Sequence, residues 1–162
     1  MHQAFLVNTL IVSIHWGEKM KAILKLFAVA AFGAICYGII ENVERGYSHI
    51  TMGALGGVSM IIIHELNGER HQGRIGIFAV LIISMLFITS GELLAGEILN
   101  RRLGMKIWNY HEMPLNFDGQ ICLLYSLIWL FLSLFGMVAD DLIRRFIFFE
   151  PISNDPIGKR IE

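Results

Sequence analysis

Apolar residues in this chain gather into long runs that short polar segments separate. A helix needs about 20 apolar residues to cross roughly 30 Å of hydrocarbon. Four stretches come near this length and predict membrane-spanning helices: residues 26–44, 49–67, 75–99 and 119–139. The pattern therefore predicts an all-α fold, a polytopic integral membrane helical bundle.

A fifth apolar stretch, residues 4–14, is too short to span comfortably, and we expect a short, interfacial or partly inserted N-terminal helix. An extra span or a cleaved signal peptide are alternatives, although no positive segment precedes the stretch and no small-residue cleavage site follows it. The predicted organisation is an N-terminal helix and basic linker (1–25), a four-helix membrane domain (26–146) with a structured loop (100–118), and a polar cytoplasmic tail (147–162).

The positions of Lys and Arg predict the orientation, because short cytoplasmic loops carry them in excess. With the N-terminus inside, nine lie in inner segments: Lys19, Lys21, Lys25, Arg70, Arg74, Arg144, Arg145, Lys159 and Arg160. Four lie in outer loops: Arg45, Arg101, Arg102 and Lys106. We therefore expect a multi-pass protein of the cell membrane with both termini in the cytoplasm.

Composition supports the membrane assignment, with 55% hydrophobic and 17% charged residues against roughly 45–50% and about 25% in soluble domains. The 13 basic and 14 acidic residues nearly cancel, so no field attracts nucleic acid. Cys36 and Cys122 fall inside apolar spans without metal-type spacing, which indicates small packing residues. The expected surroundings are the lipid bilayer, and no cofactor is indicated.

Only five of the 27 charged residues fall within the four spans, and all are glutamates: Glu41, Glu44, Glu65, Glu92 and Glu97. Ionisable groups at membrane depth are costly and usually face a bundle interior or a watery cavity. Glu44 and Glu65 stand close to loops, and Glu97 is near a helix end, which favours interfacial positions for these three. Glu41 and Glu92 are the candidates for function.

Glu41 shares a helix face with Tyr37 and Arg45, because the three are spaced four apart. This spacing allows a Glu41–Arg45 ion pair of the favoured orientation. The face either carries a simple structural pair or lines an outward-facing pocket. His49 is expected at the start of the next span.

Glu92 belongs to a stripe of polar and small residues formed with Thr89, Gly96 and Asn100. Such a stripe faces protein or water, and Glu92 is its deepest carboxylate. Desolvation favours a neutral, hydrogen-bonded carboxyl, whereas a functional site would carry a proton or bind a cation; both interpretations stay open.

Glycines near the start of the second span predict close helix packing, with a backbone-lined cavity as the alternative. They are Gly53, Gly56 and Gly57.

The segment 104–120 is dense in aromatic and amide residues. Trp108 and Tyr110 suit the membrane interface, and Pro114 prevents a continuous helix. Asp118 is expected to cap the last span, with Gln120 in its first turn. The segment forms either a re-entrant element or a surface lid anchored by its aromatic rings. Turn chemistry before the last span comes from Asn116, Asp118 and Gly119.

Four blocks carry a family resemblance: Tyr37-Gly38-Ile39-Ile40-Glu41, Arg45-Gly46-Tyr47-Ser48-His49, Thr89-x-x-Glu92-x-x-x-Gly96-x-x-x-Asn100, and Ile107-Trp108-Asn109-Tyr110-x-x-x-Pro114-Leu115-Asn116-x-x-Gly119-Gln120-Ile121-Cys122-Leu123 with Trp129. Over roughly residues 26–146 the chain resembles the putative ABC-transporter type IV family of small bacterial membrane proteins. The resemblance implies a transport-related component of the bacterial inner membrane without defining its chemistry. Asn109 stands where many relatives carry Asp, which weakens any proposal that needs an anion there.

Known catalytic motifs are not found. The nearest approach to a phosphate-binding loop, residues 68–75, has Arg74 and Ile75 where Lys and Ser or Thr are required, so ATP-driven work needs a separate subunit. His64-Glu65 lacks the second histidine of zinc proteases, and no nucleophile elbow occurs. An acid–base pair of Glu41 or Glu92 with His49 remains as a lipid-active enzyme alternative.

The leading hypothesis is a transport-related membrane component that binds a small polar or cationic ligand in a Glu-lined intramembrane pocket. Four spans are few for a transporter, so a homo-oligomer or a partner subunit is expected. A non-catalytic assembly or scaffold protein is the alternative. The candidate ligand-binding residues are Tyr37, Glu41, Arg45, His49, Glu92, Asn100, Trp108, Asn116 and Gln120.

Overall fold

The computed structural model describes residues 2–150, with side chains for residues 17–43 and 46–150. Four α-helices are α1 (His2–Arg45), α2 (Ile50–His71), α3 (Ile77–Ala95) and α4 (Leu123–Leu142). The π-helical segments η1 (Gly96–Arg102) and η2 (Ile143–Ile147) continue α3 and α4. The strands β1 (Asn116–Phe117) and β2 (Ile121–Cys122) form an antiparallel hairpin.

Four helices in the described part of the chain are long and apolar enough to cross a membrane, which confirms the predicted helical bundle: Gly17–Val43, Ile50–His71, Ile77–Arg102 and Leu123–Ile147. The last helix starts at Leu123, later than the predicted residue 119, because the β-hairpin occupies the intervening residues. It also continues beyond residue 139, so that Asp140 and Asp141 are helical.

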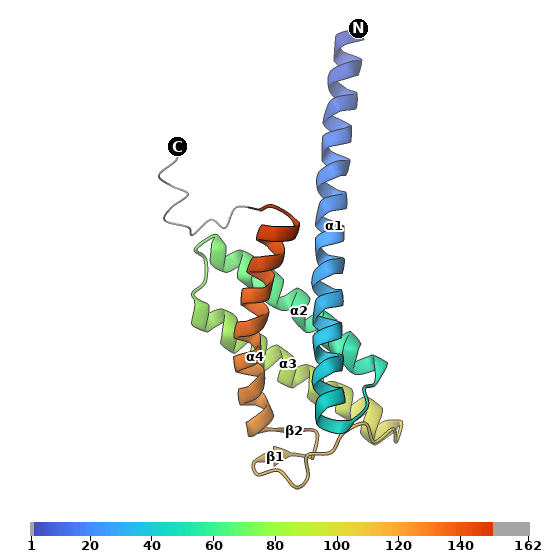
Figure 1. Cartoon of the computed structure of the whole chain (residues 1–162), viewed down its shortest axis with the longest axis vertical. Coiled ribbons are helices and arrows are strands. Elements are labelled where there is room, and N and C mark those ends of the chain that lie inside the picture. Colours follow the sequence, from blue (N-terminus) through green and yellow to red (C-terminus); the bar gives the residue numbers. More distant parts are fainter. Residues whose placement is uncertain (1, 151–162) are drawn as a thin grey trace.

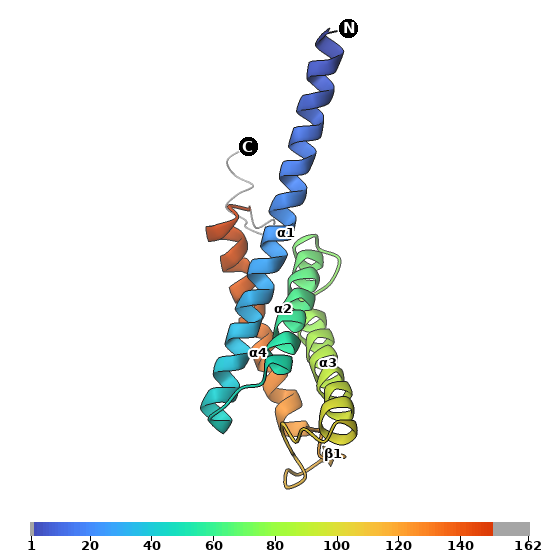
Figure 2. The ribbon, with the colours of Figure 1, turned by 90° about the vertical axis from the view of Figure 1, so that its right-hand side faces the viewer.

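The predicted N-terminal helix over residues 4–14 is not a separate element. It is the first part of α1, a single helix of 44 residues, which at 1.5 Å per residue is about 66 Å long. No proline interrupts residues 2–45, so no residue without an amide hydrogen stops the helix. The N-terminal part of α1 projects beyond the other helices (Figures 1 and 2).

Helix α1 packs mainly on α2, which also contacts α3 and α4. The close packing predicted from glycines is confirmed. A Cβ atom at Gly56 would lie 2.7 Å from the Gly33 carbonyl oxygen, and one at Gly57 would lie 3.0 Å from the Ala30 carbonyl oxygen. Only residues without a side chain allow the two backbones to come so near.

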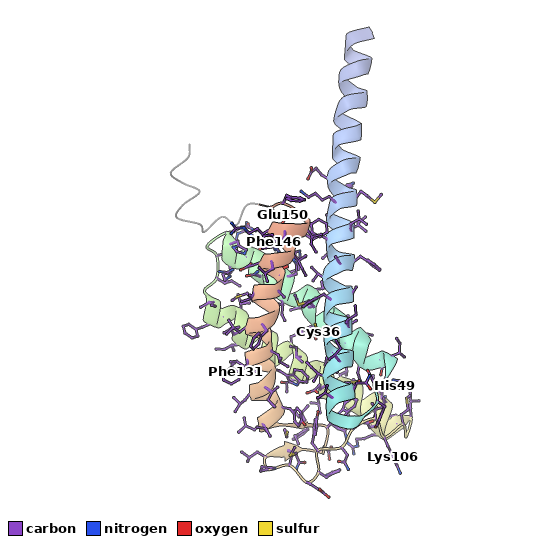
Figure 3. The ribbon with its side chains drawn as sticks, in the orientation of Figure 1. Cys36, His49, Lys106, Phe131, Phe146 and Glu150 are labelled. Atoms are coloured by element: carbon purple, nitrogen blue, oxygen red, sulfur yellow. The ribbon has the colours of Figure 1, made fainter. Side chains whose placement is uncertain are left out.

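The bundle has two ends. Residues 103–122 cover one end, which we call the loop end, and the turn between α2 and α3 lies at the other, which we call the turn end (Figures 1 and 2). His49 and Lys106 lie at the loop end, and Glu150 at the turn end (Figure 3).

Buried apolar residues form one cluster toward each end. The loop-end cluster is Tyr37, Met52, Ile88, Ile107, Trp108, Tyr110, Cys122 and Trp129. The turn-end cluster is Val29, Met60, Ile63, Val80, Met137 and Ile143. Many large apolar side chains remain exposed, including Phe27 at 73% and Phe135 at 70%, as lipid-facing positions require.

The hairpin confirms the predicted turn chemistry before α4. Asn116 pairs with Cys122 and Phe117 with Ile121, and Gly119 has a φ of +66°, with the His111 ring 2.6 Å from where a Cβ atom would lie. The predicted cap was wrong. Cys122 occupies the N-cap position of α4 without a side-chain hydrogen bond, and Asp118 instead accepts a hydrogen bond from Arg101 at 2.6 Å.

Candidate functional site

Glu92 lies in the interior of the bundle near the loop end, and only 1% of its surface is exposed. The indole Nε1 of Trp129 donates to Oε2 at 2.7 Å. The hydroxyl groups of Tyr37 and Tyr110 donate to Oε1 at 3.4 Å and 3.5 Å. These neutral donors come from α4, α1 and the loop, so one carboxylate joins three parts of the fold to α3.

Aromatic rings surround this carboxylate. Tyr37 stacks on Trp129 with ring centroids 5.4 Å apart, and Tyr110 stacks on Tyr125 at 4.5 Å. Trp129 belongs to the resembling block at the start of α4, but the predicted ligand-binding set did not include it. Its spacing from Glu92 along the chain gives no sign that the two side chains meet.

The residues that donate hydrogen bonds to Glu92 line two cavities. A cavity of about 420 Å³, which we call the loop cavity, is bounded by Tyr47, Lys106, Ile107, Trp108, Asn109, Tyr110, Met113 and Tyr125. An apolar groove of about 330 Å³ between α1, α2, α3 and α4 is lined in part by Tyr37, Ser59, Ile88 and Trp129. Tyr110 therefore connects Glu92 to the loop cavity, and Tyr37 and Trp129 connect it to the groove.

Glu41 is also buried, with 2% of its surface exposed. Its Oε2 accepts hydrogen bonds from the Ser48 hydroxyl at 2.8 Å and from the His49 backbone amide at 3.2 Å. The His49 ring contacts Thr51 instead. Its Nδ1 lies 2.7 Å from the Thr51 hydroxyl and caps α2. The predicted partner Arg45, and Glu44 beside it, lie outside the described side chains.

Asn100 and Gln120 hold the loop against the end of α3. Asn100 donates to the Trp108 carbonyl and to Gln120 Oε1, both at 3.0 Å, and accepts from the Ile107 amide at 2.6 Å. The Trp108 indole donates to the Gln120 carbonyl at 2.9 Å. Gly96 leaves space for Gln120, since a Cβ atom there would overlap the Gln120 side chain.

Asn116 organises the hairpin. Its amide nitrogen donates to the Met113 carbonyl at 2.8 Å, and its oxygen accepts from the Gly119 amide at 3.1 Å. Its bonds are thus within the loop. Glu97 lies near the helix end and pairs with Arg101. Glu65 is exposed but lies six residues before the end of α2 at His71, because this helix continues beyond the predicted residue 67.

A second buried polar cluster lies toward the turn end. Asp140 is fully buried and contacts His64 Nδ1 at 2.5 Å, Asn67 Nδ2 at 2.8 Å and Arg144 Nε at 2.8 Å. Arg144 also donates to the His64 carbonyl at 2.8 Å. This cluster fixes α2 against α4.

Asp141 extends the cluster toward the surface. It contacts Arg70 at 3.0 Å, His71 at 2.7 Å and Asn67 at 2.6 Å. The sequence prediction missed this cluster, because the last span was expected to stop at residue 139. The sequence does contain a signal for this cluster. Asp140 and Asp141 directly follow an apolar run, and His64 and Asn67 stand three residues apart on another span.

Among known proteins, the sequence model of the family described as "Putative ABC-transporter type IV" matches residues 43–152. The chain belongs to this family. The matched range confirms the resemblance and includes Glu92, the loop and the buried polar cluster around Asp140. It begins after Tyr37 and Glu41, so that block lies outside it. No curated protein and no solved structure matches the chain.

Proposed function

We propose that this member of the Putative ABC-transporter type IV family is a transport-related membrane component that binds a small organic cation at the loop cavity. The observation that carries the proposal is Glu92, a buried carboxylate held by three aromatic donors, one of which, Tyr110, lines that cavity. A cation entering the cavity would approach Tyr110 first and the carboxylate second.

The lining of the loop cavity supports an ammonium group as the ligand. Four of its side chains are aromatic: Tyr47, Trp108, Tyr110 and Tyr125. Aromatic faces attract ammonium groups through the ring quadrupole, by about 2 kcal/mol or more when the site is desolvated. A carboxylate in low-dielectric surroundings adds attraction of the same sign. Aromatic lining and buried acid together favour an amine or a quaternary ammonium over an anion.

Coupling to transport follows from the elements that Glu92 connects. Its donors lie on α1, α4 and the loop. A cation that draws the carboxylate toward the loop cavity would weaken those bonds together and change how the three elements pack. The sequence lacks a phosphate-binding loop, so ATP hydrolysis would come from a partner subunit.

The test measures thermal unfolding of the purified, full-length protein in detergent with tetramethylammonium, using tert-butanol as a neutral molecule of similar size. At about ten times the dissociation constant, tetramethylammonium should raise Tm by roughly 3–6 °C, and tert-butanol should not. Glu92→Gln should lose this response. The matched control is Glu97→Gln, which removes a carboxylate that pairs with Arg101 near the helix end and should keep it.

The scaffold alternative makes the opposite prediction. If Glu92 only fastens the loop and α1 to the bundle, tetramethylammonium will not stabilise the wild-type protein. Glu92→Gln will then lower the folded yield without changing any ligand response. That result would reject the transport proposal.

A further inference from the structure

Helices α1 and α4 border an open side of the bundle. Helix α1 packs mainly on α2, and α4 packs mainly on α3 and α2, so direct packing between α1 and α4 is sparse among the described residues. The stacked rings of Tyr37 and Trp129 join the two helices near the loop end. The apolar groove runs along the same side, and its lining includes Phe32 of α1 and Phe135 of α4. Both phenylalanines are exposed, so the groove opens toward the hydrocarbon of the bilayer.

Two cations stand on the same two helices nearer the turn end. Nζ of Lys25 on α1 lies 2.8 Å from Oε1 of Glu150, and Nη1 of Arg144 on η2 lies 3.5 Å from Oε2. The side chains of Lys25 and Arg144 are only 15% and 14% exposed. A carboxylate therefore already sits between a cation of α1 and a cation at the end of α4, which shows that this place accepts an anion.

The other contacts of Arg144 leave one nitrogen for this anion. Its Nε donates to Asp140 and its Nη2 to the His64 carbonyl, both at 2.8 Å. Asp140 thus balances the charge of Arg144, and Glu150 balances that of Lys25. A phosphodiester carries one negative charge, as Glu150 does, so exchanging one for the other leaves the local charge balance unchanged.

The groove and the two cations are aligned along the bundle. Phe32 comes seven residues after Lys25 on α1, and Gly136, which also lines the groove, comes eight residues before Arg144. At 1.5 Å per residue, both separations are about 10–12 Å. Helices α1 and α4 run in opposite directions (Figure 1), so both cations lie on the turn side of the groove. This arrangement fits an amphiphile with an anionic head and a hydrocarbon chain.

We propose that an anionic phospholipid of the turn-end leaflet binds between α1 and α4, with its phosphate at Lys25 and Arg144 and one acyl chain in the apolar groove. The distribution of Lys and Arg predicts that this leaflet is cytoplasmic. Basic pockets between membrane helices on that side bind anionic headgroups. The site is distinct from the loop cavity, which lies at the other end of the bundle.

Glu150 competes with the lipid for the two cations. Its backbone amide donates to the Arg144 carbonyl at 2.9 Å, so the phosphate needs only the Glu150 side chain to turn away. Removing the negative charge of Glu150 should therefore strengthen lipid binding, whereas removing the positive charge of Lys25 should weaken it. A purely structural ion pair predicts that both changes lower stability and that neither changes lipid binding.

The test is native mass spectrometry of the delipidated, full-length protein in detergent, with equal amounts of phosphatidylglycerol and phosphatidylcholine that carry the same chains. Wild-type protein should retain one phosphatidylglycerol in preference. Lys25→Gln should reduce this preference about fivefold, and Glu150→Gln should raise it by a similar factor. Arg74→Gln is the matched control, because Arg74 is an exposed cation of the turn end that pairs with Glu69; it should keep the wild-type preference.

A second set of measurements tests the acyl chain. Cys36 lines the groove and lies on the loop side of Glu150 (Figure 3). Cys36→Phe should fill part of the groove and lower the retention of both lipids, and Cys36→Ala should not. Glycerol 3-phosphate, which has the charge of the headgroup without the chains, should not displace phosphatidylglycerol.

Three results would overturn the inference: an unchanged preference in Lys25→Gln, weaker phosphatidylglycerol binding in Glu150→Gln, or full lipid retention in Cys36→Phe. Displacement by glycerol 3-phosphate would equally reject a lipid as the ligand. The tetramethylammonium response separates this site from the cation site. Lys25→Gln should keep that response, because Lys25 pairs with Glu150 at the end of the bundle away from the loop cavity.

Discussion

The two most buried carboxylates of the membrane domain are stabilised by different kinds of neighbour. Glu92 is held by Trp and Tyr donors, whereas Asp140 is held by His64, Asn67 and Arg144. A buried charge is tolerated when it is paired and fully hydrogen-bonded. Asp140 is therefore part of a charged network that fixes α2 against α4, whereas Trp129, Tyr37 and Tyr110 are neutral donors to Glu92.

Asp140→Asn tests, at the residue scale, the structural role of the buried polar cluster that Asp140 forms with His64, Asn67 and Arg144. The substitution leaves Arg144 and His64 buried beside an uncharged amide, and breaking a buried pair costs roughly 3–5 kcal/mol. The variant should unfold at a clearly lower temperature in detergent. Asp141→Asn is the control; its carboxylate is 24% exposed, so its loss should cost about 1 kcal/mol or less. Equal losses in the two variants would contradict this assignment.

At the scale of elements, α1 is held to α2 by backbone proximity. Gly33 and Gly56 face each other, and Tyr37 packs beside Gly56. Tyr37 is also the α1 residue that reaches Glu92. The glycine contact therefore sets how far this donor extends into the bundle.

Gly56→Ala should separate α1 from α2. The new Cβ atom would lie 2.5 Å from the Tyr37 Cβ and 2.7 Å from the Gly33 carbonyl oxygen, and such overpacking costs about 1–3 kcal/mol. Thermal unfolding should show the loss, and the tetramethylammonium response should weaken with it. Gly17→Ala, where nothing lies within 4 Å, should be neutral or stabilising. A Gly56→Ala protein as stable as the wild type would rule out this contact.

At the scale of the whole molecule, four membrane helices place the loop end and the turn end on opposite faces of the bilayer. The charge distribution predicts that the turn end is cytoplasmic. The two ends also differ in their side chains. The loop end has the loop cavity with its aromatic lining, and the turn end has the buried polar cluster that contains His64 and Asp140.

Cysteine labelling tests this topology. With Cys36 and Cys122 replaced by alanine, Glu112→Cys at the loop end should react with an impermeant maleimide in intact cells. Gln72→Cys, at the exposed turn between α2 and α3, should react only after the membrane is permeabilised. The reverse pattern would show that the predicted orientation is wrong, without affecting the fold.

Much of the architecture could be predicted from sequence, because each cue is local. Apolar length identified the four spans, the Thr89–Asn100 stripe singled out Glu92, and Gly119 marked the turn. The cap at Asp118 was wrong because the hairpin extends to Cys122 and delays the start of α4. The separate N-terminal helix was wrong because local composition does not say whether two helical segments join into one.

The sequence by itself determined that the chain forms four membrane helices and that Glu92 lies among them, since the length of an apolar run and the cost of a charge within it are properties of one segment. Only the tertiary structure decided which polar groups meet. His64 and Asp140 are 76 residues apart, and Trp129 reaches Glu92 from another helix. Those meetings depend on the rotation and register of packed helices, which neighbouring residues in the sequence do not encode.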